Sequence, residues 1–337
     1  MANNTSLMAV AGGLTATVEN KVSEMLKDGR LDLPVDYSAN NALKAMQLAV
    51  IECVDRNKRP ALEVCTKESV IQTMLSMVVQ GLNPDKKQCY PIVYGNKLTL
   101  FRSYFGAMAV AKRVDPNIED IVAQVVYKSE KDGFEIETQS NGKMLVTKHK
   151  PDVFGSRTRD DIIGAYCTVT YKDGTAWSEF RNFAQIKDAW KHSARNPIDD
   201  KGEIKEGTTH YTETEDMCRR TIINRVCKII INSSSDENLV AQFARETQRD
   251  MDKAEAEERI EANLSQGEMV DIPAEPEEVE VVNSYPNEEP AEPQTEQPEP
   301  VEAEKPKRGR KPAHKAEETA ETDPIPSFED IENPFNV

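Results

Sequence analysis

The first eighty residues carry apolar side chains at the three-to-four residue spacing of amphipathic helices. One such stripe consists of Leu14, Val18, Val22 and Leu26. Ser38 is a suitable N-cap for a second helix and Thr66 for a third, and Gly81 suits the C-terminal end of that third helix. The pattern therefore predicts three helices ahead of residue 82, each with one face in a core.

From residue 88 the spacing changes to that of β-strands. Residues 89–94 and 97–101 flank Gly95-Asn96 and predict a hairpin, which leads into a helix that ends at Arg113. Three further segments, separated by Asp-Gly and Asn-Gly turns, predict an antiparallel meander; they are 121–128, 134–138 and 143–149.

A second hairpin and two helices complete this part of the chain. The hairpin is predicted from strands 162–171 and 175–183 about Asp173-Gly174, followed by a short helix that contains Trp190 and a longer helix over 214–231. The fold class is therefore α+β, with antiparallel hairpins and a meander packed against helices.

The charge of the chain is concentrated near its end. Residues 251–337 hold 8 basic and 25 acidic side chains, a net charge of −17 that equals the net charge of the whole chain. This segment is rich in Pro and Glu and cannot bury enough apolar area to offset the entropy of ordering. We therefore predict a flexible N-terminus over 1–14, one domain over 15–247, and a disordered acidic tail over 248–337.

Two short motifs interrupt the acidic tail. The basic patch KPKRGRKP at 305–312 resembles an AT-hook, whose Arg-Gly-Arg core lies in narrow minor grooves. A cluster that only balances charge is the alternative interpretation. The stretch FEDIENPF at 328–335 resembles the acidic tips of bacterial single-strand binding proteins, which dock on partner proteins. If the resemblances hold, both motifs contact other macromolecules.

Several classes of protein are disfavoured by what the sequence lacks. It has no C-x-x-C pair, no secretory signal, no membrane-length apolar run and no Walker loop. We therefore expect a cytoplasmic, ATP-independent protein with reduced, mostly buried thiols and no enzymatic activity. One enzymatic alternative is a metal-dependent nuclease that uses Asp152, Glu203 and Lys205, but the surroundings of Glu203 are typical of a loop.

Tyrosines, phenylalanines, lysines and arginines alternate with small residues between Gly81 and Arg113. This mixture is typical of single-strand binding, in which rings stack on bases and cations contact phosphates. A second basic set lies on the helix over 214–231 and the short helix before it. The alternative is that the rings cover a core and the cations face solvent. The candidates are Lys86, Lys87, Tyr94, Lys97, Arg102, Tyr104, Lys112, Arg113, Trp190, Lys191, Arg219, Arg220 and Arg225.

Two blocks of residues resemble the RecT family of phage single-strand annealing proteins. The first runs from Gly-Leu-Asn-Pro at Gly81 through Cys89-Tyr90, Tyr94-Gly95 and Ser103-Tyr104 to Ala111-Lys112-Arg113. The second consists of Trp190-Lys191, Met217-Cys218-Arg219-Arg220-Thr221 and Arg225. The resemblance covers about residues 15–245.

The resemblance implies a function and a set of partners. The fold would be that of ring-forming annealing proteins, which pair complementary strands without ATP, with Mg²⁺ only as a modulator. Implied partners are single-stranded DNA, the annealed duplex, further copies of the chain in a ring or filament, a phage exonuclease and the host single-strand binding protein, all in the bacterial cytoplasm. A scaffold that binds DNA without annealing it is the alternative. By position, Tyr94 and Tyr104 would be structural or stacking residues, and the phosphate contacts would be Lys112, Arg113, Arg219, Arg220 and Arg225.

Overall fold

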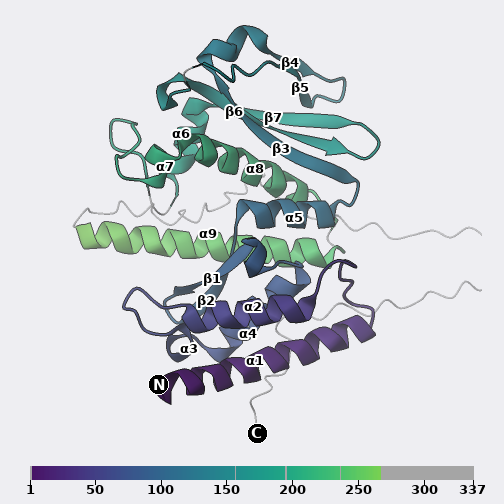
Figure 1. Ribbon diagram of the computed structural model, residues 1–337, viewed down its shortest axis with the longest axis vertical. Coiled ribbons are helices and arrows are strands. Elements are labelled where there is room, and N and C mark those ends of the chain that lie inside the picture. Colours follow the sequence, from purple (N-terminus) through teal and green to yellow (C-terminus); the bar gives the residue numbers. More distant parts are fainter. Residues whose placement is uncertain (1, 156, 194–195, 236, 267–337) are drawn as a thin grey trace, which may run out of the picture. The chain divides into compact units, whose positions relative to one another are not determined.

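A computed structural model of the chain describes residues 2–155, 157–193, 196–235 and 237–266 (Figure 1). Over these residues the protein combines helices with two antiparallel sheets, which confirms the predicted α+β class. The tail beyond residue 266, with the motifs at 305–312 and 328–335, lies outside the described residues.

The predicted N-terminal helices are present. They are α1 (Ala2–Lys27), α2 (Ala39–Glu52) and α4 (Lys67–Val79), with the short α3 (Ala61–Val64) between the last two. The Ser38 and Thr66 side chains cap α2 and α4, and Gly81 takes the left-handed φ of 63° expected after a helix end. Helix α1 differs from the prediction because it begins at Ala2, within the segment expected to be flexible. Its early residue Ala11 is fully buried, so core packing extends into that segment.

The first hairpin forms as predicted. Strands β1 (Cys89–Tyr94) and β2 (Lys97–Arg102) pair antiparallel with Tyr94 opposite Lys97. The 3-10 turn η1 (Pro84–Lys86) precedes them, and α5 (Tyr104–Val114) follows. One face of the hairpin packs with α1, α2 and α4 in a first hydrophobic cluster.

The larger sheet has five strands in the order β3-β6-β7-β5-β4. One connection differs from the predicted meander, because β3 pairs with β6 and not with β4. In place of a tight turn, the 3-10 helix η2 (Lys128–Gly133) carries the chain away from β3. The strands are β3 (Ile118–Tyr127), β4 (Phe134–Thr138), β5 (Met144–His149), β6 (Ile162–Tyr171) and β7 (Ala176–Asn182).

A buried carboxylate organises the turn at η2. The Glu130 side chain is fully buried and lies 3.1 Å from both His149 Nε2 and Arg157 Nη2. Burial opposes ionisation of Glu130, but backbone N–H groups of Tyr127 and Asp152 and the His149 ring bond to the carboxylate. Together these bonds hold the pKa of Glu130 below its ordinary value. The carboxylate therefore ties the end of β3 to β5 and to the loop after it.

Three helices lie around the loop after the second hairpin, of which the first precedes the loop and the other two follow it. They are α6 (Phe183–Lys191), α7 (Thr209–Thr212) and α8 (Thr214–Asn232), and the 3-10 turn η3 (Arg159–Asp161) leads into β6. Helix α8 lies against one face of the five-stranded sheet, where α5 and α6 also contribute to a second hydrophobic cluster (Figure 1). Helix α5 joins both clusters, because Val110 faces the first and Ala107 and Ala111 face the second.

Helix α9 (Leu239–Gln266) continues past residue 247, where the tail was predicted to begin. It crosses between the α1–α4 helices and the α5–α8 layer (Figure 1). On its buried face, Ala241 and Ala244 are fully buried and Thr247 is nearly so. Because these side chains are small and only weakly hydrophobic, the hydrophobic pattern did not predict a helix here. The domain therefore includes residues that the charge distribution had assigned to the tail.

The remaining general expectations concern cysteines and membrane segments. All six cysteines are free, and four of them are buried, as predicted. Burial raises the pKa of the Cys89 thiol to about 12. Within the described ranges, no helix is both long and apolar enough to cross a membrane.

Candidate nucleic-acid interface

Helix α8 presents a basic face to solvent because its other face is buried in the second cluster. Cys218, Ile222 and Val226 are fully buried against the sheet. Several residues of α8 remain exposed, and four of them fall within about 140° of one another around the helix axis at 3.6 residues per turn. These four, which we call the α8 basic face, are Arg220, Asn224, Arg225 and Lys228.

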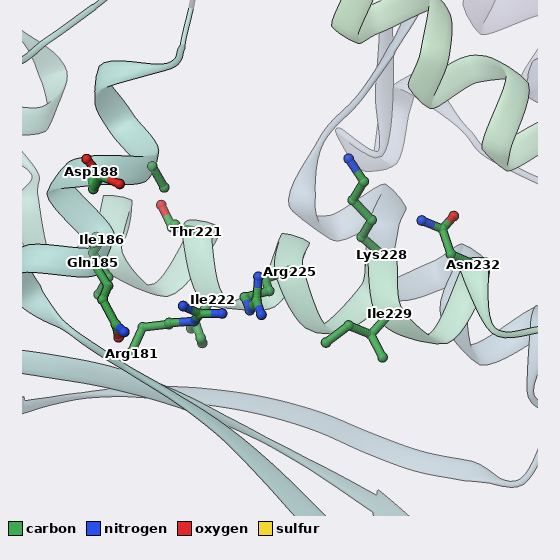
Figure 2. A pocket seen from close by; sticks show the side chains of 11 residues that line it. Arg181, Gln185, Ile186, Asp188, Thr221, Ile222, Arg225, Lys228, Ile229 and Asn232 are labelled. Atoms are coloured by element: carbon green, nitrogen blue, oxygen red, sulfur yellow. The ribbon is translucent and has the colours of Figure 1, made fainter. Parts of the chain in front are cut away.

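A groove of about 590 Å³ runs along this face between α6 and α8 (Figure 2). Arg181 reaches into it from β7, toward Arg225 on α8 (Figure 2). Both guanidinium groups contact one oxygen of Glu179, at 3.3 Å from Arg181 Nε and 2.6 Å from Arg225 Nε. Two cations share one carboxylate, so this part of the groove keeps a net positive charge.

A second basic surface lies where η1 meets the start of α5. The Ser103 hydroxyl caps α5 and donates to Lys87 O at 2.6 Å, which holds the two exposed lysines Lys86 and Lys87 beside the helix. Next to the cap, the Tyr104 ring lies 5.4 Å from the guanidinium carbon of Arg220. The α8 basic face therefore continues across Tyr104 onto α5, and we call Lys86, Lys87, Tyr104 and Phe105 the aromatic step.

Other predicted cations form ion pairs within the protein. Arg219 contacts Glu215 and, at 3.2 Å, Asp216. Lys112 Nζ lies 3.1 Å from Asp120 Oδ1. Lys191 Nζ lies 3.9 Å from Asp188, which is also on the groove wall. Exposed pairs of this kind are weak, so these cations can exchange a carboxylate for a phosphate.

Two predicted residues lie inside the fold. Arg102 is buried, and its guanidinium donates to Gln80 Oε1 at 2.9 Å and to Ala244 O at 3.3 Å. Burial lowers the pKa of Arg102 to about 10, which leaves it charged at neutral pH. Trp190 is also buried, and its indole donates to Thr221 Oγ1 at 2.8 Å. Through these hydrogen bonds Arg102 connects α9 to the hairpin, and Trp190 connects α6 to α8.

The remaining hairpin candidates lie near α9. The Tyr94 ring stacks on Phe101 at 5.6 Å, and its hydroxyl donates to Glu258 Oε2 at 3.2 Å. Burial and this carboxylate raise the pKa of Tyr94. Lys97 is exposed on a separate groove that Asp250 also lines. These two residues therefore belong to a different surface from the aromatic step.

Arg113 is half-buried beneath the end of α5. Its guanidinium donates to Gln80 O and lies 5.7 Å from the centre of the Tyr37 ring. It also covers Gly81, where an added Cβ would approach Arg113 Cζ to 2.6 Å. Burial lowers the pKa of Arg113. The prediction that it contacts phosphate remains untested, but the structure gives it a packing role.

We expect Arg113→Ala to destabilise the protein by about 2–3 kcal/mol, because it removes a charged hydrogen bond and a cation–π contact. Lys112→Ala should change stability by less than about 0.5 kcal/mol, because its ion pair is exposed. Urea unfolding of the two variants measures the difference. Equal stabilities would show that these contacts of Arg113 do not stabilise the fold.

The residues of the nuclease alternative contact different parts of the fold. Asp152 Oδ1 accepts a hydrogen bond from Gly155 N at 2.9 Å, whereas the Glu203 carboxylate lies 4.0 Å from Lys187 on α6. Lys205 donates its backbone N–H to Pro197 O. Where the chain is described, no three His, Cys, Asp or Glu side chains gather as metal ligands would. The geometry gives the nuclease interpretation no support.

Two residues of this surface were not among the predicted candidates. Arg181 could have been found from strand alternation, which places it on the same face as Trp177 and Glu179. Phe105 could have been found from helical spacing, because Gly106, Ala107, Val110 and Ala111 form the buried stripe of α5. Neither pattern shows that Arg181 and Phe105 lie on two surfaces that α8 connects.

Comparisons with known proteins identify the family of the chain. No curated protein matches the sequence significantly. The sequence model of the RecT family matches residues 44–261, which include both hairpins, α5, α8 and most of α9. The chain therefore belongs to the RecT family of phage single-strand DNA annealing proteins.

Proposed function

We propose that this protein binds single-stranded DNA along the α8 basic face and anneals it to a complementary strand without ATP. The observation that carries the proposal is the exposed row of cations on α8 in a member of an annealing family. Arg181 and Arg225 would hold phosphates in the groove, and Arg220 would hold them at the aromatic step. Bidentate guanidinium groups suit phosphate oxygens, and their binding releases counterions.

The length of this face favours assembly of several subunits. Arg220 and Lys228 are eight residues apart on α8, which corresponds to about 12 Å along the helix at 1.5 Å per residue. A strand with a rise of about 3.4 Å per nucleotide places three or four phosphates over that distance. Because so few contacts bind weakly, stable binding requires neighbouring subunits on one strand. We therefore infer a ring or helical filament.

Annealing itself requires no covalent chemistry from the protein. Pairing releases about 1.4 kcal/mol per stacked step, so the strands supply the free energy. The protein lowers the repulsion between strands by neutralising phosphates, and it leaves base edges open to an incoming strand. Mg²⁺ would modulate this step by screening the same phosphates. A phage exonuclease would supply the strands in the bacterial cytoplasm, and the host single-strand binding protein would compete for them.

The test mixes two complementary fluorescent oligonucleotides with the protein, in separate reactions with ATP, with Mg²⁺ and with EDTA. We expect annealing to be faster than the spontaneous rate in every reaction, with intact strands recovered at the end. Binding should weaken steeply with salt. Binding without faster annealing would identify a scaffold, and cleavage that stops in EDTA would identify a nuclease.

A further inference from the structure

Phe105 is an exposed aromatic residue on a surface that is otherwise basic. The residue is 48% exposed and lies on the side of α5 opposite the buried stripe of Gly106, Ala107, Val110 and Ala111. Its ring packs on Tyr104, with 4.0 Å between ring centres and 33° between ring planes. Tyr104 in turn lies under Arg220. The outer face of Phe105 is thus available to a planar ligand.

The charges around this ring fit a nucleic acid. Among the described residues, no carboxylate forms an ion pair with Lys86, Lys87 or Arg220, unlike the paired cations Lys112 and Arg219. Three cations that keep their charge beside two rings would attract phosphates while the rings contact bases. An acidic partner without rings would leave the two rings without a stacking contact. A purely apolar partner would leave the three cations without a counter-charge.

The backbone next to the ring is held in an uncommon conformation. Lys87 adopts a left-handed φ of 54°, which disfavours a residue with a side chain. Its carbonyl accepts the Ser103 hydroxyl, and the Ser103 N–H donates to Gln88 O at 2.9 Å. The turn and the start of α5 are therefore joined, which sets the backbone of Lys87 close to that of the residues before Phe105.

We propose that Phe105, supported by Tyr104, is a stacking site for a base of the bound single strand. This inference rests on the proposed function and adds to it, because it assigns a base contact where the α8 basic face provides only phosphate contacts. A base that stacks on the ring would be unstacked from the neighbouring base on that side. It would also tolerate any sequence, as annealing of arbitrary strands requires.

The test compares Phe105→Ala, Phe105→Leu and Phe105→Trp in the full chain with a single-stranded oligonucleotide that carries 2-aminopurine. For Phe105→Ala we expect affinity to fall about 5- to 150-fold, the equivalent of about 1–3 kcal/mol per stacked base. Leucine should behave like alanine, because it is apolar but has no ring, whereas tryptophan should retain binding. The quenching of 2-aminopurine fluorescence on binding should disappear with alanine and leucine and persist with tryptophan. The slope of log affinity against log salt should stay the same, because no charge is removed.

Phe154 provides a matched control, since it is 100% exposed on the loop after β5. Phe154→Ala should leave affinity and quenching unchanged. If Phe105→Ala retains wild-type affinity and quenching while the wild type still anneals, the stacking site is wrong and the proposed function stands. If the wild type binds no single strand, both fail. If Phe105→Ala changes the mass of the DNA-free protein in light scattering, the ring is a contact between copies and the stacking site is also wrong.

Discussion

Replacing both Arg220 and Arg225 by alanine is expected to weaken single-strand binding about 100-fold, at about 1.4 kcal/mol for each lost phosphate contact. Arg220 is exposed beside Tyr104, and Arg225 shares Glu179 with Arg181. Neither guanidinium supports the buried core, so the fold should persist. Acceleration of annealing should be lost at protein concentrations that saturate the wild type.

The slope of log affinity against log salt gives a second readout. Each phosphate contact on a single strand contributes about 0.7 to that slope, so the double variant should lower its magnitude by about 1.4. Fluorescence anisotropy across a series of salt concentrations measures both the affinity and the slope. Circular dichroism on the same samples checks that the helices remain.

The matched control removes two arginines from the α1–α2 part of the fold. Arg30 and Arg59 are exposed and pair with Asp28 and Asp55. Their double alanine variant has the same net charge as the first variant, and we expect affinity within twofold of the wild type. Equal losses in both variants would mean that binding follows total charge, and the α8 basic face would then not be the path of the strand.

Gly106→Ala should destabilise the protein by about 3 kcal/mol, the upper end of the range for overpacking in a core. A Cβ at this position would lie 2.1 Å from Gln88 O and 2.8 Å from Arg102 Cγ. The Gln88 carbonyl cannot move away freely, because it accepts the Ser103 N–H at 2.9 Å. The clash therefore separates α5 from the hairpin and displaces Tyr104 and the aromatic step.

Gly13→Ala is the control for this substitution. Gly13 lies in the interior of α1, and an added Cβ would have no atom within 4 Å. Alanine is the better helix former, so this variant should gain about 0.5–1 kcal/mol in urea unfolding. A neutral or stabilising Gly106→Ala would show that the close approach of α5 to Gln88 is not a constraint on the fold.

Local patterns were sufficient for most elements of the fold. Ser38, Thr66 and Ser103 sit at helix starts where a short polar side chain satisfies free N–H groups, and both hairpins follow from alternation around a turn. Strand order was not accessible in the same way. The choice of β6 as the partner of β3 depends on η2 and on contacts of the buried Glu130, which no local pattern shows.

The site was only partly predictable for a related reason. Lys86, Lys87, Tyr104, Arg220 and Arg225, which composition and the family resemblance made candidates, lie on joined surfaces. Their contact with DNA stays a prediction. Residue type alone could not distinguish them from Arg102, Arg113 and Trp190, which have the same chemistry but lie buried or half-buried. That distinction depends on where α9, Tyr37 and α8 pack around these three residues, which is set by contacts distant in sequence.

The position of α9 has a consequence for the order in which the chain folds during synthesis. Phe243 and Ala244 belong to the same hydrophobic cluster as Leu14 and Val18 near the start of the chain. Arg102 likewise bonds to Ala244 O across 142 residues of sequence. The part of this core that Phe243 and Ala244 cover therefore stays open until the end of the domain has left the ribosome. Contacts of such long range form slowly, so the nascent protein exposes apolar surface to chaperones until α9 has emerged.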